Sequence, residues 1–223
     1  AMKIAQIAGF LGSGKTTLLI EVAKELVTRG KRIAIVVNDV GEINVDFKIV
    51  DSYGLKAREM SGGCICCEIA GNFANTLALL YTSFNPDIVI VEPSGVAIPW
   101  GLKRAAEYSE AEVPVTIDHA PVLTLVDSTR IDALLGTVRR LVVTQIREAD
   151  VCLINKVDAS DEGRIKRSED LVKEINPKCE IMRISTHKGM GVKEVAQIIA
   201  ERSSSRYDEA VERELLRQQY GSG

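Results

Sequence analysis

The sequence lacks the marks of a membrane-spanning, secreted or nucleic-acid-binding protein. No apolar run approaches the ~20 residues of a membrane span, and the N-terminus lacks the basic, apolar and small-residue order of a signal peptide. The net charge is -3 and charges of both signs are mixed along the chain, so no broad basic face is expected for nucleic acid or a membrane. We therefore expect a cytoplasmic protein with protein and small-molecule partners, no nucleic acid and no membrane.

Cysteine is sparse and unevenly placed. The chain has five cysteines among 223 residues, and three of them, Cys64, Cys66 and Cys67, fall within the stretch "SGGCICCEIAG". An odd number of cysteines and a cytoplasmic compartment both argue against a framework of disulfides, so metal binding or thiol chemistry is the better interpretation. Cys152 lies in an apolar run and is predicted to pack in the core, whereas Cys179 is a lone residue beside a turn.

Apolar segments rich in β-branched residues alternate with segments of helical periodicity. The predicted strands are residues 3–8, 32–37, 87–92, 122–127, 151–155 and 180–185. The predicted helices are residues 16–30, 68–84, 130–149, 162–175 and 192–202. The 46% hydrophobic content can bury a core, and the alternation predicts an α/β fold with a doubly wound, mainly parallel sheet. Ligands are then expected outside the carboxyl ends of the strands.

The first chemical motif is "GFLGSGKTT", which fits G-x-x-x-x-G-K-[ST] through Gly9, Gly14, Lys15 and Thr16. It follows a predicted strand and opens a helix, which is the context of a phosphate-binding P-loop. Lys15 is expected to reach the β- and γ-phosphate oxygens, and the Thr16 hydroxyl to ligate Mg²⁺. The residues assigned to nucleotide binding in this loop are Gly12, Ser13, Gly14, Lys15, Thr16 and Thr17.

The second motif, "NKVD", predicts the base. Asn155, Lys156 and Asp158 stand at the carboxyl end of a late strand, where the sheet would place them beside the P-loop. A carboxylate there accepts from both N1–H and the exocyclic amine of guanine, whereas adenine offers neither donor at those positions. GTP and GDP are therefore the expected ligands. Ser185, in a loop after the next strand, either supports the base or is an ordinary turn serine.

Carboxylates at two other strand ends complete the predicted nucleotide site. Glu92, in "VEPSG", can hold Mg²⁺ directly or through water, and Gly95 can present its N–H to the γ-phosphate. Asp39, at the end of the second strand, either orients the Mg²⁺ shell and the attacking water or is a turn aspartate. Lys15, Asp39 and Glu92 are the predicted catalytic residues, and Thr16, Asp39 and Glu92 the predicted Mg²⁺ ligands.

The clustered cysteines lie between Asp39 and Glu92, so their position should depend on the bound nucleotide. Thiolates at Cys64, Cys66 and Cys67 suit Zn²⁺, with Glu42, water or a partner as the fourth ligand. Cu(I), Co²⁺ and Ni²⁺ are alternatives. Two other interpretations are a redox switch and small core hydrophobes, but "SGG" before the cysteines favours an accessible loop.

Taken together, "GFLGSGKTT", "NDVGEINVD", "GCICC", "VEPSGVAIP", "QIREADVCLINKVD" and "ISTHKGMGV" resemble the CobW-like branch of the metallochaperone GTPases, relatives of the UreG, HypB and MeaB chaperones. The similarity spans residues 3–200. It implies a SIMIBI-type P-loop GTPase domain over residues 1–202, metal held by the "GCICC" thiolates and released to a client metalloprotein with GTP hydrolysis, and a nucleotide-dependent homodimer. Residues 203–223 are predicted to be a polar linker and a C-terminal helix, with no second domain.

The chain departs from this family in ways that leave other functions open. Many relatives continue into a second domain, often with a His-rich stretch, whereas this chain has only His119 and His187. His119 is predicted to be an exposed loop residue rather than an auxiliary ligand. A gate for a corrinoid-dependent enzyme and a thiol-redox-regulated GTPase switch are the alternative functions. Unassisted turnover is predicted to be slow, because no arginine finger or Ras-like glutamine is evident near Gly95.

Overall fold

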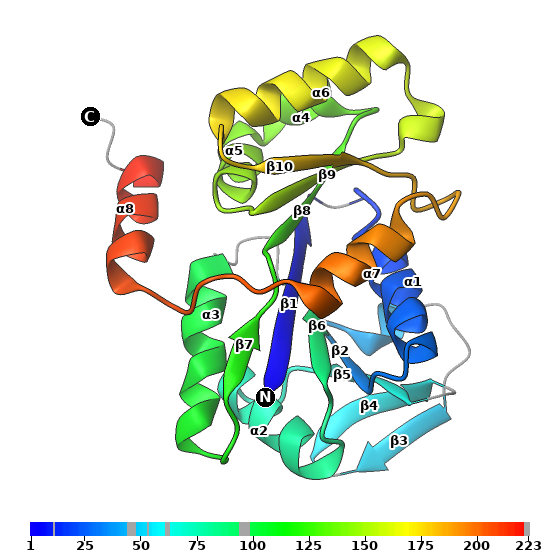
Figure 1. Ribbon diagram of the computed structural model, residues 1–223, viewed down its shortest axis with the longest axis vertical. Helices are drawn as coiled ribbons and strands as arrows, with labels where there is room; N and C mark the ends of the chain where they lie inside the picture. Colours follow the sequence, from blue (N-terminus) through cyan, green and yellow to red (C-terminus); the bar gives the residue numbers. More distant parts are fainter. Residues whose placement is uncertain (11, 44–47, 53, 61–62, 94–98, 221–223) are drawn as a thin grey trace.

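The computed structural model describes residues 1–10, 12–43, 48–52, 54–60, 63–93 and 99–220, without the side chains of 42 and 48–52. Its described strands form one sheet of ten strands in the order β10-β9-β8-β1-β6-β2-β5-β4-β3, with β7 also paired to β1 (Figure 1). The strands are β1 Met2–Gly9, β2 Ile33–Val37, β3 Lys48–Ser52, β4 Leu55–Met60, β5 Cys64–Glu68, β6 Ile88–Val91, β7 Ile117–His119, β8 Leu123–Asp127, β9 Val151–Asn155 and β10 Glu180–Arg183.

The sheet is parallel except at one edge, where β4 pairs antiparallel with both β3 and β5. Strands β2, β6, β8 and β9 are buried throughout, as their unbroken apolar sequences predict. Alternate residues of β2 enter different cores: Ile33 and Ile35 pack with one cluster, and Ala34 and Val36 with another. Both faces of the sheet are therefore covered by helices, which confirms the predicted doubly wound α/β fold.

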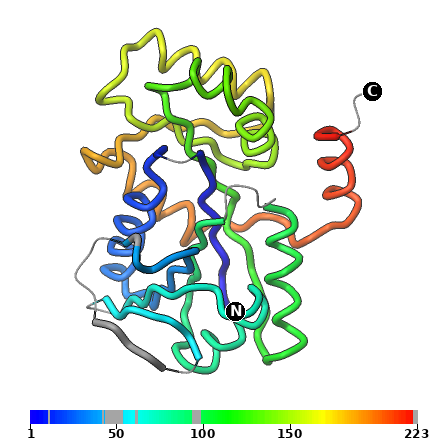
Figure 2. Tube along the Cα trace, turned by 180° about the vertical axis from the view of Figure 1, so that it is seen from behind, coloured from blue at the N-terminus to red at the C-terminus, as the bar shows by residue number. Residues whose placement is uncertain are grey.

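Helices α1 and α7 lie side by side on one face of the sheet, as Figures 1 and 2 both show. The helices are α1 Lys15–Thr28, α2 Phe73–Ser83, α3 Pro99–Glu107, α4 Ile131–Thr137, α5 Arg139–Arg147, α6 Glu162–Ile175, α7 Val192–Glu201 and α8 Glu209–Tyr220, with short 3₁₀ turns η1 Val40–Glu42, η2 Tyr108–Ala111 and η3 Val157–Ala159. Among the described residues, no helix is both long and apolar enough to cross a bilayer.

Several predicted elements differ from the structure for local reasons. The helix predicted over 130–149 is two helices, because Val138 leaves helical geometry (φ -130°, ψ 35°) between α4 and α5. The helix predicted over 68–84 begins at Phe73, where the Asn72 side chain caps it by accepting from the Asn75 N–H. Strands β3, β4, β5 and β7 and helix α3 were not predicted.

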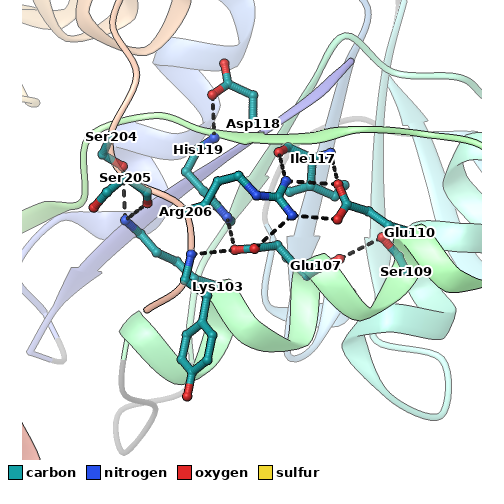
Figure 3. A network of polar contacts seen from close by, with 12 residues as sticks. Lys103, Glu107, Ser109, Glu110, Ile117, Asp118, His119, Ser204, Ser205 and Arg206 are labelled. Carbon is teal, nitrogen blue, oxygen red and sulfur yellow. Dashed lines mark hydrogen bonds and ion pairs between the residues drawn. The ribbon is translucent and has the colours of Figure 1, made fainter. Parts of the chain in front are cut away.

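The segment after α7 is held to α3 and β7 by a network of polar contacts (Figure 3). The fully buried Lys103 donates to the Ser204 hydroxyl (3.1 Å) and the Ser205 carbonyl (2.7 Å). Glu107 accepts from the ring of His119 (2.9 Å) and pairs with Arg206 (3.0 Å). The prediction that His119 is exposed was therefore wrong: it is buried in β7, and burial lowers its pKa. By contrast, α8 buries no residue and stands away from the sheet (Figure 2).

Candidate nucleotide site

The P-loop connects β1 to α1 through glycines that no other residue could replace without strain. Gly14, at the N-terminus of α1, has φ 102°, and a Cβ there would lie 2.5 Å from the Asn155 Nδ2 atom. A Cβ at Gly9 would lie 2.8 Å from the Ser13 hydroxyl oxygen. No side chain caps α1 and its first turn carries no acidic residue, so its N–H groups and partial positive charge are available to an anion.

The predicted Mg²⁺ ligands converge beside this loop. Thr16, Asp39 and Glu92 line one cavity of about 20 Å³, large enough for a single water-sized group. Asp39 is fixed there because its Oδ1 accepts from the Gly41 N–H at 2.8 Å. The Lys15 Nζ lies 3.6 Å from the Glu92 Oε1. The structure thus brings together a hydroxyl, two carboxylates and a cation, the donor set that Mg²⁺ and phosphate require.

The "NKVD" segment is hydrogen-bonded directly to the P-loop. The buried Asn155 donates from Nδ2 to the Ser13 carbonyl (2.7 Å) and accepts from the Thr186 N–H at Oδ1 (3.1 Å). The Lys156 Nζ donates to the Gly12 carbonyl at 2.7 Å. Asn155 and Lys156 therefore hold the predicted base-binding loop against the predicted phosphate-binding loop.

Asp158 and Ser185 form the other half of the predicted base site. The buried Ser185 hydroxyl donates to the Asp158 Oδ1 at 2.7 Å and accepts from the Lys188 N–H at 3.2 Å. The hydrogen bond from Ser185 is the main cause that lowers the pKa of Asp158, so this exposed carboxylate is ionised and oriented at neutral pH. Ser185 thus orients the carboxylate that is predicted to read the base, and its own part in base binding stays a prediction.

Asp127 is a site residue that the sequence reasoning missed. Its buried carboxylate accepts from Lys156 (2.7 Å), from Arg130 (2.8 Å) and from the Thr129 hydroxyl (2.6 Å). Burial raises the pKa of Asp127, but these hydrogen bonds outweigh it and the net direction is down. Arg130 lies over the P-loop, since a Cβ at Gly12 would be 3.0 Å from its Nη2. The sequence feature that could have indicated Asp127 is its position as the acidic residue at the end of the apolar run "VLTLVD".

The clustered cysteines occupy a buried strand and not the accessible loop that "SGG" suggested. Strand β5 pairs parallel with β2 and antiparallel with β4, so neighbours on both sides enclose it. Cys64 and Cys66 pack into the core on one face of the sheet, and Cys67 into the core on the other. Burial raises the pKa of the Cys64 and Cys67 thiols to about 12, and that of Cys66 further. In this conformation the thiols are protonated small core residues.

The other predicted metal ligands are only partly described. Within the described residues, no three His, Cys, Asp or Glu side chains are grouped so that they could hold a metal ion. The side chain of Glu42 and all of Gly95 lie outside the described part of the chain. The assignments of Cys64, Cys66, Cys67 and Glu42 to a transition metal therefore stay predictions.

Comparison with known proteins places this arrangement in one family. Residues 3–183 match the family model of the CobW/HypB/UreG nucleotide-binding domain. The zinc chaperone CobW of Sinorhizobium sp is 32% identical over 194 residues, covering 74% of this chain and 54% of the relative. The zinc-regulated GTPase metalloprotein activator 1 of Dictyostelium discoideum is 28% identical, covering 87% of this chain and 48% of the relative. The chain spans about half the length of the curated relatives it matches.

Solved structures share the fold. The Zn(II)-bound YjiA GTPase from E. coli superposes with a TM-score of 0.68 at 21% identity, covering 96% of this chain and 69% of that one. The hydrogenase maturation factor HypB from Archaeoglobus fulgidus has a TM-score of 0.55 at 20% identity, covering 89% of each chain. The arrangement of strands and helices is therefore that of P-loop proteins of this kind.

Proposed function

The chain belongs to the CobW/HypB/UreG family of nucleotide-binding domains, and we propose that it is a GTP-binding and GTP-hydrolysing metallochaperone whose cargo is a transition metal, Zn²⁺ in the first place. Co²⁺ and Ni²⁺ are the alternative cargoes. The names of its relatives, zinc chaperone and zinc-regulated GTPase metalloprotein activator, support this choice. A client metalloprotein and a nucleotide-dependent homodimer belong to the same proposal.

The choice of GTP is supported by the contact between base loop and phosphate loop. Asp158, oriented by the hydrogen bond from Ser185, would accept two hydrogen bonds from guanine through its carboxylate. Lys156 spans from Asp127 to the Gly12 carbonyl, so the same lysine joins the base side of the site to the phosphate side. A guanine nucleotide would therefore be held at both ends by elements that already contact one another.

Hydrolysis is assigned to the residues around the small cavity. Lys15 lies where it can move from Glu92 to the β- and γ-phosphate oxygens, because its amino group is only 3.6 Å from that carboxylate. Asp39 and Glu92 would orient the attacking water, and the Thr16 hydroxyl would join them in holding Mg²⁺. Bound Mg²⁺ supplies charge neutralisation at the β- and γ-phosphates.

The proposed coupling between nucleotide and metal rests on a hydrogen bond that joins the Asp39 segment to the cysteine strand β5. The Val40 N–H, one residue after Asp39, donates at 3.2 Å to Oε1 of Glu68, the last residue of the cysteine strand. Within the sheet, Cys66 also pairs with Ile35 of β2, the strand that leads to Asp39. A shift of Asp39 toward Mg²⁺ would therefore pull on β5, and the metal-binding thiols would respond to the nucleotide.

Loading with metal requires β5 to change. In the present conformation Cys64 and Cys66 share one face of the sheet and can converge, whereas Cys67 points to the other face. All three thiols also need to lose a proton before they can bind, because only the thiolate is a metal ligand. We infer that the loaded state frees the end of β5 from its neighbours.

The test is a Zn²⁺ competition titration against a chromophoric chelator, run without nucleotide, with GDP and with a non-hydrolysable GTP analogue. We expect Zn²⁺ affinity to differ at least tenfold between nucleotide states. Cys66→Ser and Cys67→Ser should each abolish tight binding, and Cys179→Ser, at a cysteine outside the cluster, is the matched control. Equal Zn²⁺ affinity in all three nucleotide states would contradict the proposed coupling. Tight Zn²⁺ binding by the Cys66→Ser/Cys67→Ser double variant would show that the metal binds at another site.

A further inference from the structure

Arg130, directly before α4, brings a positive charge to the P-loop from outside both nucleotide motifs. Its guanidinium lies over Gly12, where a Cβ would be 3.0 Å from Nη2, 3.6 Å from Cζ and 3.7 Å from Nη1. The Arg130 side chain is 40% exposed, so a ligand that enters the P-loop from solvent can reach it. The arginine therefore stands beside the predicted nucleotide site without a role assigned to it by either motif.

Asp127 holds Arg130 in this position. The Asp127 side chain is fully buried, and its Oδ2 accepts from the Arg130 Nε at 2.8 Å and from the Lys156 Nζ at 2.7 Å. Its other oxygen, Oδ1, accepts from the hydroxyl (2.6 Å) and the N–H (2.9 Å) of Thr129. Charge-assisted hydrogen bonds of this kind fix the orientation of a carboxylate. The arginine is therefore placed over the P-loop before any ligand binds.

The three charged side chains favour an anion at this place. One carboxylate, Asp127, faces two cations, Arg130 and Lys156, which leaves one positive charge in excess among these groups. The N-terminus of α1 adds its partial positive charge, since its first turn carries no acidic residue. An anionic group of a ligand would therefore be attracted to the surface of the P-loop at Gly12.

The position of Gly12 indicates which part of a nucleotide would meet Arg130. The Gly12 carbonyl accepts from Lys156 of the predicted base-binding segment, whereas the loop enters α1 three residues later, at Lys15. A nucleotide with its base at Asp158 and its terminal phosphates at Lys15 would pass Gly12 between these two ends. The groups that lie between base and terminal phosphates are the ribose and the α-phosphate, and only the α-phosphate is an anion.

We propose that Arg130 binds the α-phosphate of the guanine nucleotide, and that Asp127 is the positioning residue that holds its guanidinium in place. This inference rests on the proposed function, because it requires a guanine nucleotide in the P-loop. A planar guanidinium matches two oxygens of a phosphate with two parallel N–H donors. GDP and GTP both carry an α-phosphate, so Arg130 strengthens the binding of both to the same degree.

The test is isothermal titration of the full chain with GDP and with a non-hydrolysable GTP analogue, in the presence of Mg²⁺. Arg130→Gln should weaken both nucleotides at least about tenfold. Arg130→Lys keeps the charge without the planar fork and should weaken them less. The loss in Arg130→Gln should be the same for 2′-deoxy-GDP, because the ribose is not the partner. Arg167→Gln, which removes an exposed arginine paired with Asp132 at 2.7 Å, is the matched control and should bind as the unaltered protein does.

A measurement on the unaltered protein keeps the proposal testable if Arg130→Gln does not fold. Phenylglyoxal, an arginine-selective dicarbonyl, should modify Arg130 roughly tenfold more slowly or less when GDP is present at ~100 times its Kd. Arg167 should react at the same rate with and without GDP, and peptide mapping locates both modifications. In the folded Arg130→Lys variant, the ³¹P signal of the α-phosphate of bound GDP should also shift, which a purely structural role of Arg130 would not cause.

Four results would overturn the proposal. The first is an unchanged affinity for GDP in a folded Arg130→Gln variant, and the second is a loss of affinity for the GTP analogue alone, which would place Arg130 at the γ-phosphate. The others are a loss confined to nucleotides with a 2′-hydroxyl and the failure of GDP to protect Arg130 from phenylglyoxal. These results would leave the proposed function intact, whereas an unaltered protein that binds neither nucleotide would overturn both.

Discussion

Replacing Glu148 by Gln should remove a penalty that the folded protein carries at alkaline pH. Burial raises the pKa of this carboxyl group from an ordinary value of 4.5 to about 7. A carboxyl group whose pKa is higher in the folded state binds its proton more tightly there than in the unfolded chain. The folded protein is therefore favoured while Glu148 is protonated, and that advantage is lost as the pH rises from about 4.5 through about 7.

The size of this penalty follows from the two pKa values. Their difference corresponds to ~3 kcal/mol at ~1.4 kcal/mol per pH unit, of which ~2.5 kcal/mol develops between pH 5 and pH 8.5. His119 acts in the opposite direction, because burial lowers its pKa and its contribution is lost as the pH falls. The difference between the variant and the unaltered protein cancels such common contributions and isolates Glu148.

The assay is urea unfolding of both proteins without nucleotide, at half-unit steps from pH 5 to pH 8.5. The stability of Glu148→Gln relative to the unaltered protein should rise by ~2.5 kcal/mol over this range, which is a midpoint shift of ~1 M urea. Glu174→Gln, at the exposed α6 position, should show no such trend. A relative stability that changes by less than ~0.5 kcal/mol would refute the reasoning and would mean that solvent reaches Glu148.

Two further predictions concern the nucleotide site and the cysteines. Asp158→Asn should lower GTP affinity roughly 100-fold and favour xanthosine triphosphate, because an amide donates to the carbonyl that xanthine carries in place of the guanine amine. Competition binding between the two nucleotides measures this change. An unchanged preference for GTP would contradict the assignment of Asp158 to the base. In the native protein without nucleotide, a thiol-specific chromogenic disulfide should modify Cys179 well before the other four cysteines, which are buried. Rapid modification of Cys66 or Cys67, located by peptide mapping, would contradict the buried strand.

The parts of the fold that could be predicted are those that a short window of sequence determines. Strand β9 was predicted with its observed ends because four apolar residues, Val151 to Ile154, lead into the Asn155 that opens "NKVD". Helix α6 was predicted because residues 162–175 have the periodicity of an amphipathic helix, which Asp161 caps. Strand β5 could not be predicted in the same way. Strand β5 is enclosed by β4, which pairs with it antiparallel. The apolar residues of β4, Leu55, Ala57 and Met60, do not alternate strictly with polar ones, so β4 had no clear strand pattern in the sequence.

The residues of the candidate site also differ in whether a short window of sequence determines them. The P-loop and "NKVD" motifs are local patterns, so Lys15 and Asp158 could be assigned from spacing alone. Asp127 acquires its role only because the register of β8 against β9 sets it opposite Asn155 and next to Lys156. Glu148 is further from sequence still, because nothing in the residues around it in the sequence indicates that this glutamate is buried in the fold. Asp127 had only a weak signal in the sequence and Glu148 had none, because tertiary burial alters the chemistry of both residues.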